Sequence, residues 1–275
     1  MAIYGSDDRQ PVSMPPTGSY QGVVAIDTPN KVHAPDYATY DNLPGSGIAI
    51  DSNHVLTANH VMSGNNNARV TPGVDVPALP ARETDVVPPD DSLNVSNVVA
   101  NVGRQDMALL TTTTSMAADG DVLGMVVFYD HTDLKGLQII TAGYPEAATE
   151  NSDTTARTMH TSTSPVKSTT ASTFSYDADT QSGQSGSGVW LDISEVTGVL
   201  DGVATHDLLA GIHTNAGNTA QRITPTIYKL IGDQLESDAG ANASAEAVAL
   251  PVNYLVGSIG NDYMDGTYRR EHILG

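Results

Sequence analysis

The chain of 275 residues contains no cysteine, which excludes disulfide bonds, thiol catalysis and metal sites with cysteine ligands. It also contains only one Trp and two Phe, so Val, Ile, Leu, Ala and Tyr must build most of the core. A chain of this length can bury a sizeable core without disulfides. The lack of cysteine therefore does not identify the compartment in which the protein works.

Basic residues are scarce: 12 Lys and Arg stand against 32 Asp and Glu, for a formal net charge of −20. This charge argues against nucleic acid as a partner and equally against an anionic membrane surface. The sequence has no run of 18 apolar residues, so we expect no transmembrane helix. Its first residues, MAIYGSDDRQPV, lack the basic region and apolar stretch of a secretory signal. Either a signal has been removed or export takes another route.

Short apolar runs separated by Asn, Asp, Gly, Pro and Ser dominate the rest of the chain, and this pattern is typical of an all-β protein. The expected strands are 20–27, 45–51, 54–58, 107–112, 123–129, 137–144, 188–194, 197–206 and 208–214. No regular alternation with helices is evident, so a β-barrel or sandwich is favoured over a parallel sheet.

One helix is predicted over 224–235, with Thr224 as its N-cap and Pro225 at its first position. Apolar residues at helical spacing are expected to face the core: Ile227, Leu230, Ile231 and Leu235.

Three separated polar residues carry candidate catalytic chemistry: His60 in VLTANHVM, Asp106 in GRQDMALL and Ser185 in GQSGSG. Taken singly, each has a structural interpretation: a core histidine, a turn aspartate and a serine in a flexible linker. Acyl transfer by serine needs a general base beside the hydroxyl and a carboxylate that orients the base. It also needs backbone N–H groups directed at the oxyanion, and glycines allow this close approach. The order His, Asp, Ser is the one expected for a double β-barrel.

Several motifs together resemble those of chymotrypsin-like serine peptidases, with the closest likeness to the bacterial glutamyl endopeptidase branch. These motifs are GSGIAIDSNHVLTANHV (45–61), QDMALL (105–110), TAGYP (141–145), GQSGSG (183–188), IYGSDDRQPV (3–12), GIHTNAG (211–217) and RIT (222–224). The resemblance spans about residues 2–236 and implies that His60 is the general base, Asp106 its orienting carboxylate and Ser185 the nucleophile. It also implies an oxyanion hole formed by the N–H groups of Gly183 and Ser185.

Two residues depart from the family pattern: Gln184 stands where the family often has Asn or Asp, and Gly188 stands where Pro is usual. Neither change removes a catalytic group.

The resemblance further implies a pocket that accepts an acidic residue before the scissile bond. His213 matches the pocket histidine of the family and Thr180 its pocket hydroxyl; both side chains can donate to a carboxylate. A histidine also titrates near neutrality, so its charge could assist. The structural alternative for His213 is a hydrogen-bonded core histidine. Ala2 aligns with the first residue of mature family members, whose α-ammonium lies near the pocket.

The last residues, GSIGNDYMDGTYRREHILG, contain two approximate nonapeptides that begin at Gly257 and Gly266. The first copy approximates a calcium-binding β-roll repeat, with Asp262 as a metal ligand, and the second copy is degraded. Two repeats are too few to stack stably, so the alternatives are a vestige, the start of a longer array or an acidic disordered tail. A genuine repeat would suggest type I export, which reads a C-terminal signal.

Together these observations predict two antiparallel six-stranded barrels, at 1–118 and 119–236, a linker at 237–250 and a separate repeat tail at 251–275. The expected function is that of a secreted serine endopeptidase, which acts as a monomer on proteins or peptides and cleaves after Glu and less readily after Asp. Catalysis should need no cofactor, although Ca²⁺ is expected at the tail. Two rivals stay open: a chymotrypsin-like protease of other specificity, and a non-catalytic, calcium-dependent surface module.

Overall fold

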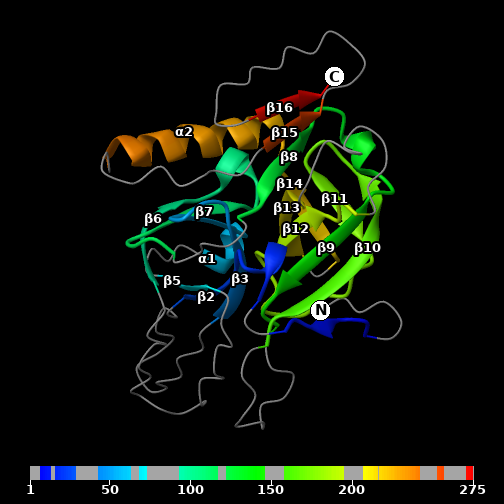
Figure 1. The fold of residues 1–275 in the computed structure, drawn as a ribbon, viewed down its shortest axis with the longest axis horizontal. Helices are drawn as coiled ribbons and strands as arrows, with labels where there is room; N and C mark the ends of the chain where they lie inside the picture. Colours follow the sequence, from blue (N-terminus) through cyan, green and yellow to red (C-terminus); the bar gives the residue numbers. More distant parts are fainter. Residues whose placement is uncertain are drawn as a thin grey trace.

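The computed structural model describes residues 7–13, 16–28, 43–62, 68–72, 93–116, 122–145, 158–194, 207–215, 217–241, 253–256 and 271–274. Two β-barrels lie side by side, with the earlier part of the chain in one and the later part in the other (Figure 1). The predicted strand 197–206 and the predicted site residues Ala2 and Asp262 lie outside the described residues.

The first barrel is closed and antiparallel, with the strand order β2-β3-β4-β7-β6-β5. Its strands are β2 (Val23–Thr28), β3 (Leu43–Ala49), β4 (His54–Thr57), β5 (Arg69–Pro72), β6 (Leu93–Val99) and β7 (Ala108–Thr112). They are short, as the spacing of the apolar runs predicts. A short helix, α1 (Asn59–Met62), follows β4 and carries His60.

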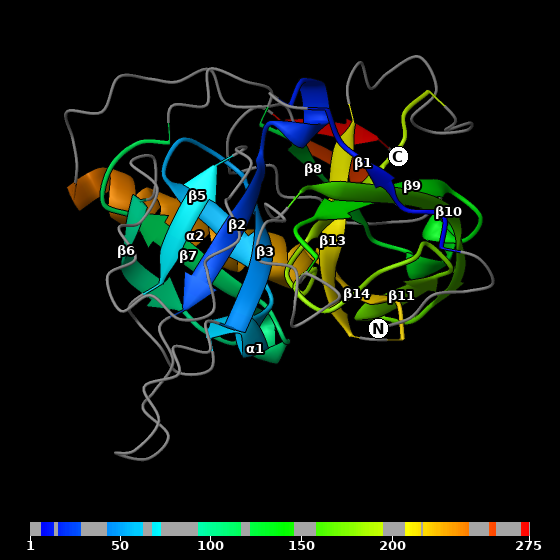
Figure 2. The ribbon, with the colours of Figure 1, turned by 90° about the horizontal axis from the view of Figure 1, so that it is seen from below.

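The second barrel repeats this path with the order β9-β10-β11-β14-β13-β12, and pairing of β12 with β13 and with β9 closes it (Figure 2). Its strands are β9 (Gln138–Gly143), β10 (His160–Thr169), β11 (Thr173–Tyr176), β12 (Gly188–Leu191), β13 (Leu208–Asn215) and β14 (Thr219–Arg222). The expectation of two antiparallel six-stranded barrels is confirmed.

Further elements surround the barrels. They are β1 (Gln10–Pro11), β8 (Gly124–Phe128), β15 (Asn253–Val256), β16 (Glu271–Leu274), α2 (Pro225–Ala241) and the 3₁₀ turns η1 (Gly18–Tyr20), η2 (Val102–Arg104) and η3 (His131–Leu134). Strand β1 pairs with β10, so this part of the N-terminal range belongs to the sheet of the second barrel. Strand β8 pairs in parallel with β13.

Three hydrophobic clusters hold the barrels together. One fills the first barrel, a second fills the other, and a third lies between them and includes residues of both barrels and of α2. Strand β2 serves two clusters, because Val24 and Ile26 face into its own barrel while Val23 and Ala25 face the interface. The side chain of Trp190 lies in the interface cluster, with Tyr20 edge-on at a centroid distance of 5.7 Å.

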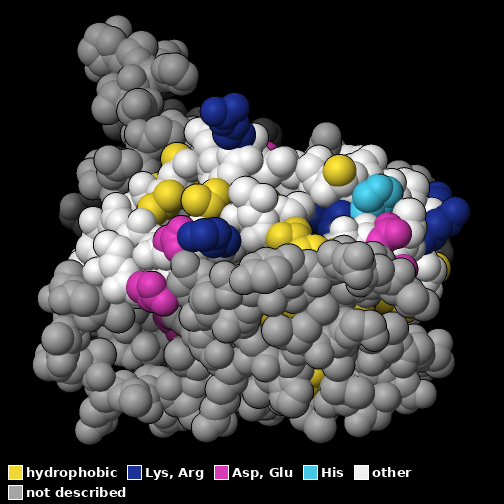
Figure 3. All heavy atoms as spheres, turned by 90° about the horizontal axis from the view of Figure 1, so that it is seen from above, with side chains coloured by type: hydrophobic (Ala, Val, Ile, Leu, Met, Phe, Trp, Pro, Cys, Tyr) yellow, Lys and Arg dark blue, Asp and Glu magenta, His cyan; other side chains and the backbone are white. Residues whose placement is uncertain are grey.

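The helix predicted over 224–235 is present, but it continues to Ala241 and so occupies the first residues of the expected linker. Its apolar face packs as predicted at Ile227, Ile231 and Leu235, whereas Leu230 is wrong as a core residue because 42% of it is exposed. On the side of the molecule where α2 lies, the described surface intersperses basic, acidic and apolar side chains (Figure 3). Neither described α-helix has the length and apolar character needed to cross a membrane.

The expectation of a separate unit at 251–275 is wrong for its described residues. Strand β15 pairs in parallel with β8, and β16 pairs in parallel with β15, so both extend the sheet of the second barrel. Leu255 enters the interface cluster, and Tyr254 and Val256 enter the cluster of the second barrel. The three consecutive apolar residues of β15 are buried on both faces of the strand, and an open sheet edge offers such a segment unpaired backbone groups.

Candidate active site

His60 lies on α1, directly after the last strand residues of β4, and its side chain is 46% exposed. Its Nδ1 lies 2.7 Å from Oδ2 of Asp106, and its backbone N–H donates to Oδ1 of the same carboxylate at 2.9 Å. The carboxylate therefore contacts both the ring and the backbone of one residue. This arrangement fixes the orientation of the imidazole and directs Nδ1 towards the carboxylate.

The loop that carries Asp106 is held close to His60 by the neighbouring Asn59, whose Oδ1 accepts the backbone N–H of Asn101 at 3.1 Å. Burial by itself raises the pKa of Asp106, but the hydrogen bonds from His60 outweigh it, so the pKa lies below its ordinary value. Asp106 is therefore ionised near neutral pH and can stabilise an imidazolium.

The loop of Ser185 is a tight turn rather than a linker. The N–H of Gln184 donates to the carbonyl of Gln181 at 3.0 Å, and the N–H of Ser187 donates to the carbonyl of Gln184 at 3.0 Å. The side chain of Gln184 is fully buried, and its Oε1 accepts the N–H of Gln181 at 2.8 Å. The departure from Asn or Asp at this position therefore places a longer amide in a structural role within the turn.

Two glycines make this turn feasible. Gly183 and Gly186 have φ angles of +91° and +88°, which L side chains rarely adopt. A Cβ on Gly186 would also lie 2.1 Å from the carbonyl oxygen of Ser46 and 3.0 Å from the backbone nitrogen of Ala58. The nucleophile loop thus lies directly against the end of β4, two residues before His60.

Two backbone donors in this loop stay unused within the described part of the chain, namely the N–H groups of Gly183 and Ser185. The peptide group that joins Ser185 to Gly186 is fixed at both ends, since Ser46 N–H donates to its carbonyl and its own N–H donates to the His213 carbonyl, both at 2.8 Å. Free N–H groups on a fixed loop are the donors that an oxyanion hole requires.

Ser185 itself is partly exposed. Among the described residues its hydroxyl makes no hydrogen bond, and this includes the bond to His60 that catalysis would need. Such contacts are often long in unliganded enzymes and tighten when a substrate binds. The structure thus brings His60 and Asp106 together and places the Ser185 loop beside them.

His213 lies on β13 behind the nucleophile loop and is 3% exposed. Its Nδ1 lies 2.6 Å from the hydroxyl of Tyr176, and burial lowers the pKa of His213 to about 3. The expectation that a charged His213 assists binding is therefore wrong for the unliganded protein, because a buried imidazole without a carboxylate neighbour stays neutral.

Thr180 is also buried, and its hydroxyl donates to Oδ1 of Asn218 at 2.5 Å. Asn218 adopts a φ of +50°, and its Nδ2 donates to the carbonyl of Ala178 at 2.7 Å. The hydroxyl proton expected to face the substrate is thus directed at a buried amide. Sequence reasoning missed Asn218, although asparagine is enriched among the non-glycine residues at positive φ.

The N-terminal segment is tied to the same loop. The N–H of Asp8 donates to Oδ2 of Asp179 at 2.9 Å, and the guanidinium of Arg9 donates to Oε1 of Gln181 at 2.5 Å. Arg9 also pairs with Asp7 and lowers the pKa of that carboxyl to about 2. Sequence reasoning placed the N-terminus near the pocket only through Ala2, whereas Asp8 and Arg9 make the described contacts.

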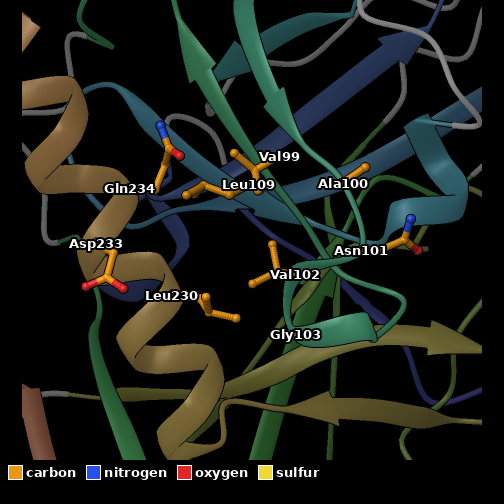
Figure 4. Close-up of a pocket in the computed structure, with 9 residues that line it drawn as sticks. All are labelled: Val99, Ala100, Asn101, Val102, Gly103, Leu109, Leu230, Asp233 and Gln234. Atoms are coloured by element: carbon orange, nitrogen blue, oxygen red, sulfur yellow. The ribbon is translucent and has the colours of Figure 1, made fainter.

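A cavity of about 360 Å³ lies between α2 and the segment that leads to Asp106 (Figure 4). It is lined by Val99, Ala100, Asn101, Val102, Gly103, Leu109, Leu230, Asp233 and Gln234. Leu230 faces this cavity from the helix, which accounts for its exposure. None of the candidate catalytic residues lines it.

A second contact between a histidine and carboxylates lies between β4 and α2. Nδ1 of His54 contacts both carboxylate oxygens of Asp51 at 2.8 and 2.9 Å, and Nε2 contacts Oδ2 of Asp238 on α2 at 3.0 Å. The described residues contain no group of three or more His, Asp or Glu side chains arranged to hold a metal ion. The calcium site at Asp262 lies outside them and stays a prediction.

Comparison with known proteins agrees with this arrangement. A profile of the trypsin-like peptidase domain matches residues 45–199, more than half of the chain. Among solved structures, a Glu endopeptidase in complex with MPD matches with a TM-score of 0.61 at 18% identity, over 86% of this chain and 100% of that one. HL collagenase matches with a TM-score of 0.50 at 15% identity, over 82% of this chain and 95% of that one. No curated protein sequence matches.

At these identities the two structures establish the fold alone, which is that of the chymotrypsin-like serine proteases. The family follows from the match to the domain profile, which includes His60, Asp106 and Ser185. The chain belongs to the trypsin-like peptidase family.

Proposed function

We propose that the protein is a serine endopeptidase in which Ser185 is the nucleophile, His60 the general base and Asp106 its orienting carboxylate. The observation that carries this proposal is the 2.7 Å contact between His60 Nδ1 and Asp106 Oδ2, beside a glycine-lined turn that presents the Ser185 hydroxyl and two unused N–H groups. A merely structural histidine would not need a partly exposed ring beside such a turn.

In the proposed reaction, Ser185 Oγ attacks the scissile carbonyl carbon and its proton passes to His60 Nε2. The carbonyl oxygen becomes an oxyanion, and the N–H groups of Gly183 and Ser185 stabilise it. The C–N bond then breaks, and the imidazolium gives its proton to the leaving amine. Water repeats the sequence on the acyl-enzyme, with His60 taking a water proton and returning it to Ser185 Oγ.

The first test is Ser185→Ala, which should lower kcat for peptide hydrolysis at least about 10⁴-fold because the covalent route is lost. Ser194→Ala is the matched control, since Ser194 is an exposed serine further along the same segment whose hydroxyl only contacts Asp192. Undiminished hydrolysis by Ser185→Ala would remove Ser185 from the mechanism. Labelling of the wild type, but not of Ser185→Ala, by a fluorophosphonate gives an independent measurement.

We further propose that cleavage follows Glu, and less readily Asp. The support is His213: when the Tyr176 hydroxyl donates to Nδ1, the proton of the neutral ring sits on Nε2, which makes no hydrogen bond within the described residues. Burial raises the pKa of Tyr176 well above its ordinary value, so this hydroxyl keeps its proton at every pH of interest. A buried neutral N–H can donate a hydrogen bond to a carboxylate although the ring carries no positive charge.

A panel of peptides that differ only in Glu, Asp, Gln, Lys or Phe before the scissile bond tests this specificity. The expected result is the highest kcat/KM for Glu, and a loss of the Glu over Gln preference in His213→Ala. A wild-type preference for Lys or Phe would contradict the pocket assignment and leave the catalytic assignment intact.

We also propose that the enzyme is secreted and acts as a monomer without a cofactor. Its acidity, which favours solubility, supports this proposal.

A further inference from the structure

Ser46 lies at the junction of the two barrels, where its backbone and its side chain both contact the nucleophile loop. It sits on β3 and is fully buried. Its N–H donates to the carbonyl of Ser185 at 2.8 Å, and its hydroxyl donates to the carbonyl of Gly183 at 2.9 Å. The same hydroxyl oxygen accepts the N–H of Tyr144 at 2.9 Å. One side chain of the first barrel therefore joins two segments of the second.

We propose that the Ser46 hydroxyl is a positioning residue for the oxyanion hole. It would hold Gly183 so that its N–H and that of Ser185 face the same point. This inference rests on the proposed peptidase function and adds a residue that does not touch the substrate.

Gly183 depends on its surroundings for its conformation. Its φ of +91° and its lack of a side chain leave its orientation to hydrogen bonds. The peptide group that follows it has two such bonds, from Ser46 Oγ to the Gly183 carbonyl and from Gln184 N–H to the Gln181 carbonyl. The second bond lies within the turn and moves with it. Ser46 supplies the contact that fixes Gly183 relative to the barrel that carries His60.

Loss of the hydroxyl would leave the buried carbonyl of Gly183 without a donor. An unpaired buried carbonyl is unfavourable, so the peptide would rotate or move towards another donor. The carbonyl and the N–H of Gly183 lie in adjacent peptide groups joined at its Cα, so a movement of the second group shifts the Cα and with it the N–H. The effect should appear where the oxyanion forms, in the transition state, and hardly at all in substrate binding.

Ser46→Ala is the test, and Thr141→Val is its matched control. Thr141 is a fully buried residue of β9 whose hydroxyl donates to the carbonyl of Gly188 at 3.1 Å. Both variants lose one buried bond from a hydroxyl to a glycine carbonyl, but only the bond of Ser46 holds an oxyanion donor. Ser46→Ala also removes the acceptor of the Tyr144 N–H, so it should lose more stability in urea unfolding than Thr141→Val.

The expected result is a fall in kcat of about tenfold to a hundredfold for Ser46→Ala with KM nearly unchanged, and wild-type kcat for Thr141→Val. The inhibition constant of a peptide aldehyde should rise by the same factor in Ser46→Ala, because its hemiacetal with Ser185 places an oxygen in the oxyanion hole. If Ser46→Ala does not fold, Ser46→Cys replaces it, since a thiol fills the same space but is a weak donor.

Equal kcat and equal aldehyde affinity in Ser46→Ala, Thr141→Val and the wild type would overturn the proposal and leave the peptidase function standing. A rise in KM with kcat unchanged would also overturn it, because that would place Ser46 in substrate binding. A wild-type protein that neither hydrolyses peptides nor binds the aldehyde would overturn the proposed function, and the role of Ser46 with it.

Discussion

Two buried histidines have pKa values shifted in opposite directions, and their neighbours explain the difference. Burial lowers the pKa of His213 to about 3, since its described hydrogen-bond partner, Tyr176, is neutral. Burial acts in the same direction on His54, but the hydrogen bonds and charges of Asp51 and Asp238 outweigh it and raise the pKa. A carboxylate neighbour thus decides whether a buried imidazole is neutral or charged.

His213 should make the protein less stable in acid. Its pKa is near 6.5 in the unfolded chain and about 3 in the folded one, so the unfolded chain binds more protons between these values. The free energy of unfolding should therefore fall as the pH drops below 6.5, by up to about 1.4 kcal/mol per pH unit, until pH 3. Urea unfolding between pH 7 and 4 should show a shallower slope for His213→Gln than for the wild type. The half-buried His131 provides the control His131→Gln, and equal slopes in all three proteins would contradict the assignment.

Sequence reasoning selected His60, Asp106 and Ser185 as candidates because each has a chemically suitable side chain within a short motif of its own. It did not find Ser46 or Asn218. The role of Ser46 depends on a partner 137 residues away, and no local pattern records that contact. The neutral state of His213 was missed for a similar reason, because it depends on burial by residues from several strands.

At the scale of elements, the hydrophobic pattern predicted seven of the twelve barrel strands and missed β5, β6, β10, β11 and β14. Buried and exposed residues alternate along part of β10, but its inward residues include Ser162 and Ser164. Ser162 donates to a carboxylate oxygen of Asp8, and Ser164 Oγ accepts the N–H of Asp177. A strand that buries serines lacks the apolar alternation by which strands are recognised. The parallel tail strand β15 was missed because its partner β8 is distant in sequence.

Helix α2 should depend on Asp238 in a manner that varies with pH. The raised pKa of His54 means that its contribution to stability is complete below the unfolded value near 6.5 and is lost as the pH rises through the folded value. Asp238→Asn should therefore lower the free energy of unfolding by about 1 to 2 kcal/mol at pH 6, and by much less at pH 9. Unfolding in urea at both pH values gives the measurement.

Asp233→Asn is the matched control for this prediction. Asp233 lies on the same helix, and its described ion pair is an exposed one with Lys229 at 2.8 Å, which should contribute little. A loss for Asp238→Asn that is the same at pH 6 and pH 9, or no larger than that for Asp233→Asn, would show that the contact with His54 does not stabilise the helix.

At the scale of the whole molecule, the repeated strand order places the candidate groups on different barrels. His60 and Asp106 belong to the first barrel and Ser185 to the second, and the cluster between the barrels is the largest shared element. The sequence order His, Asp, Ser predicts this division.

Net charge is also a property of the whole molecule. With a net charge of −20, the long-range electrostatic field of the protein repels anionic substrates.

Ionic strength should therefore change the capture of acidic peptides. Raising salt from about 20 to 300 mM shortens the Debye length and should increase kcat/KM several-fold for a Glu peptide with further acidic residues. A Glu peptide with lysines outside the cleavage site should show the opposite trend, and one with neutral flanks should change little. The same salt response for all three peptides would indicate a general effect on the enzyme instead of substrate repulsion.

The path of the chain after the second barrel has a consequence for the timing of biosynthesis. Helix α2 crosses to the first barrel, where Asp238 contacts His54 and Thr111, and β15 then returns to pair with β8. These segments follow both barrels along the chain and so leave the ribosome after them. A nascent chain with both barrels translated thus still lacks the segment that spans them, and the contacts of Asp238 with His54 and Thr111 form only after both barrels have been made. A candidate site divided between two barrels would in this way gain the segment that spans them only after both barrels have been made.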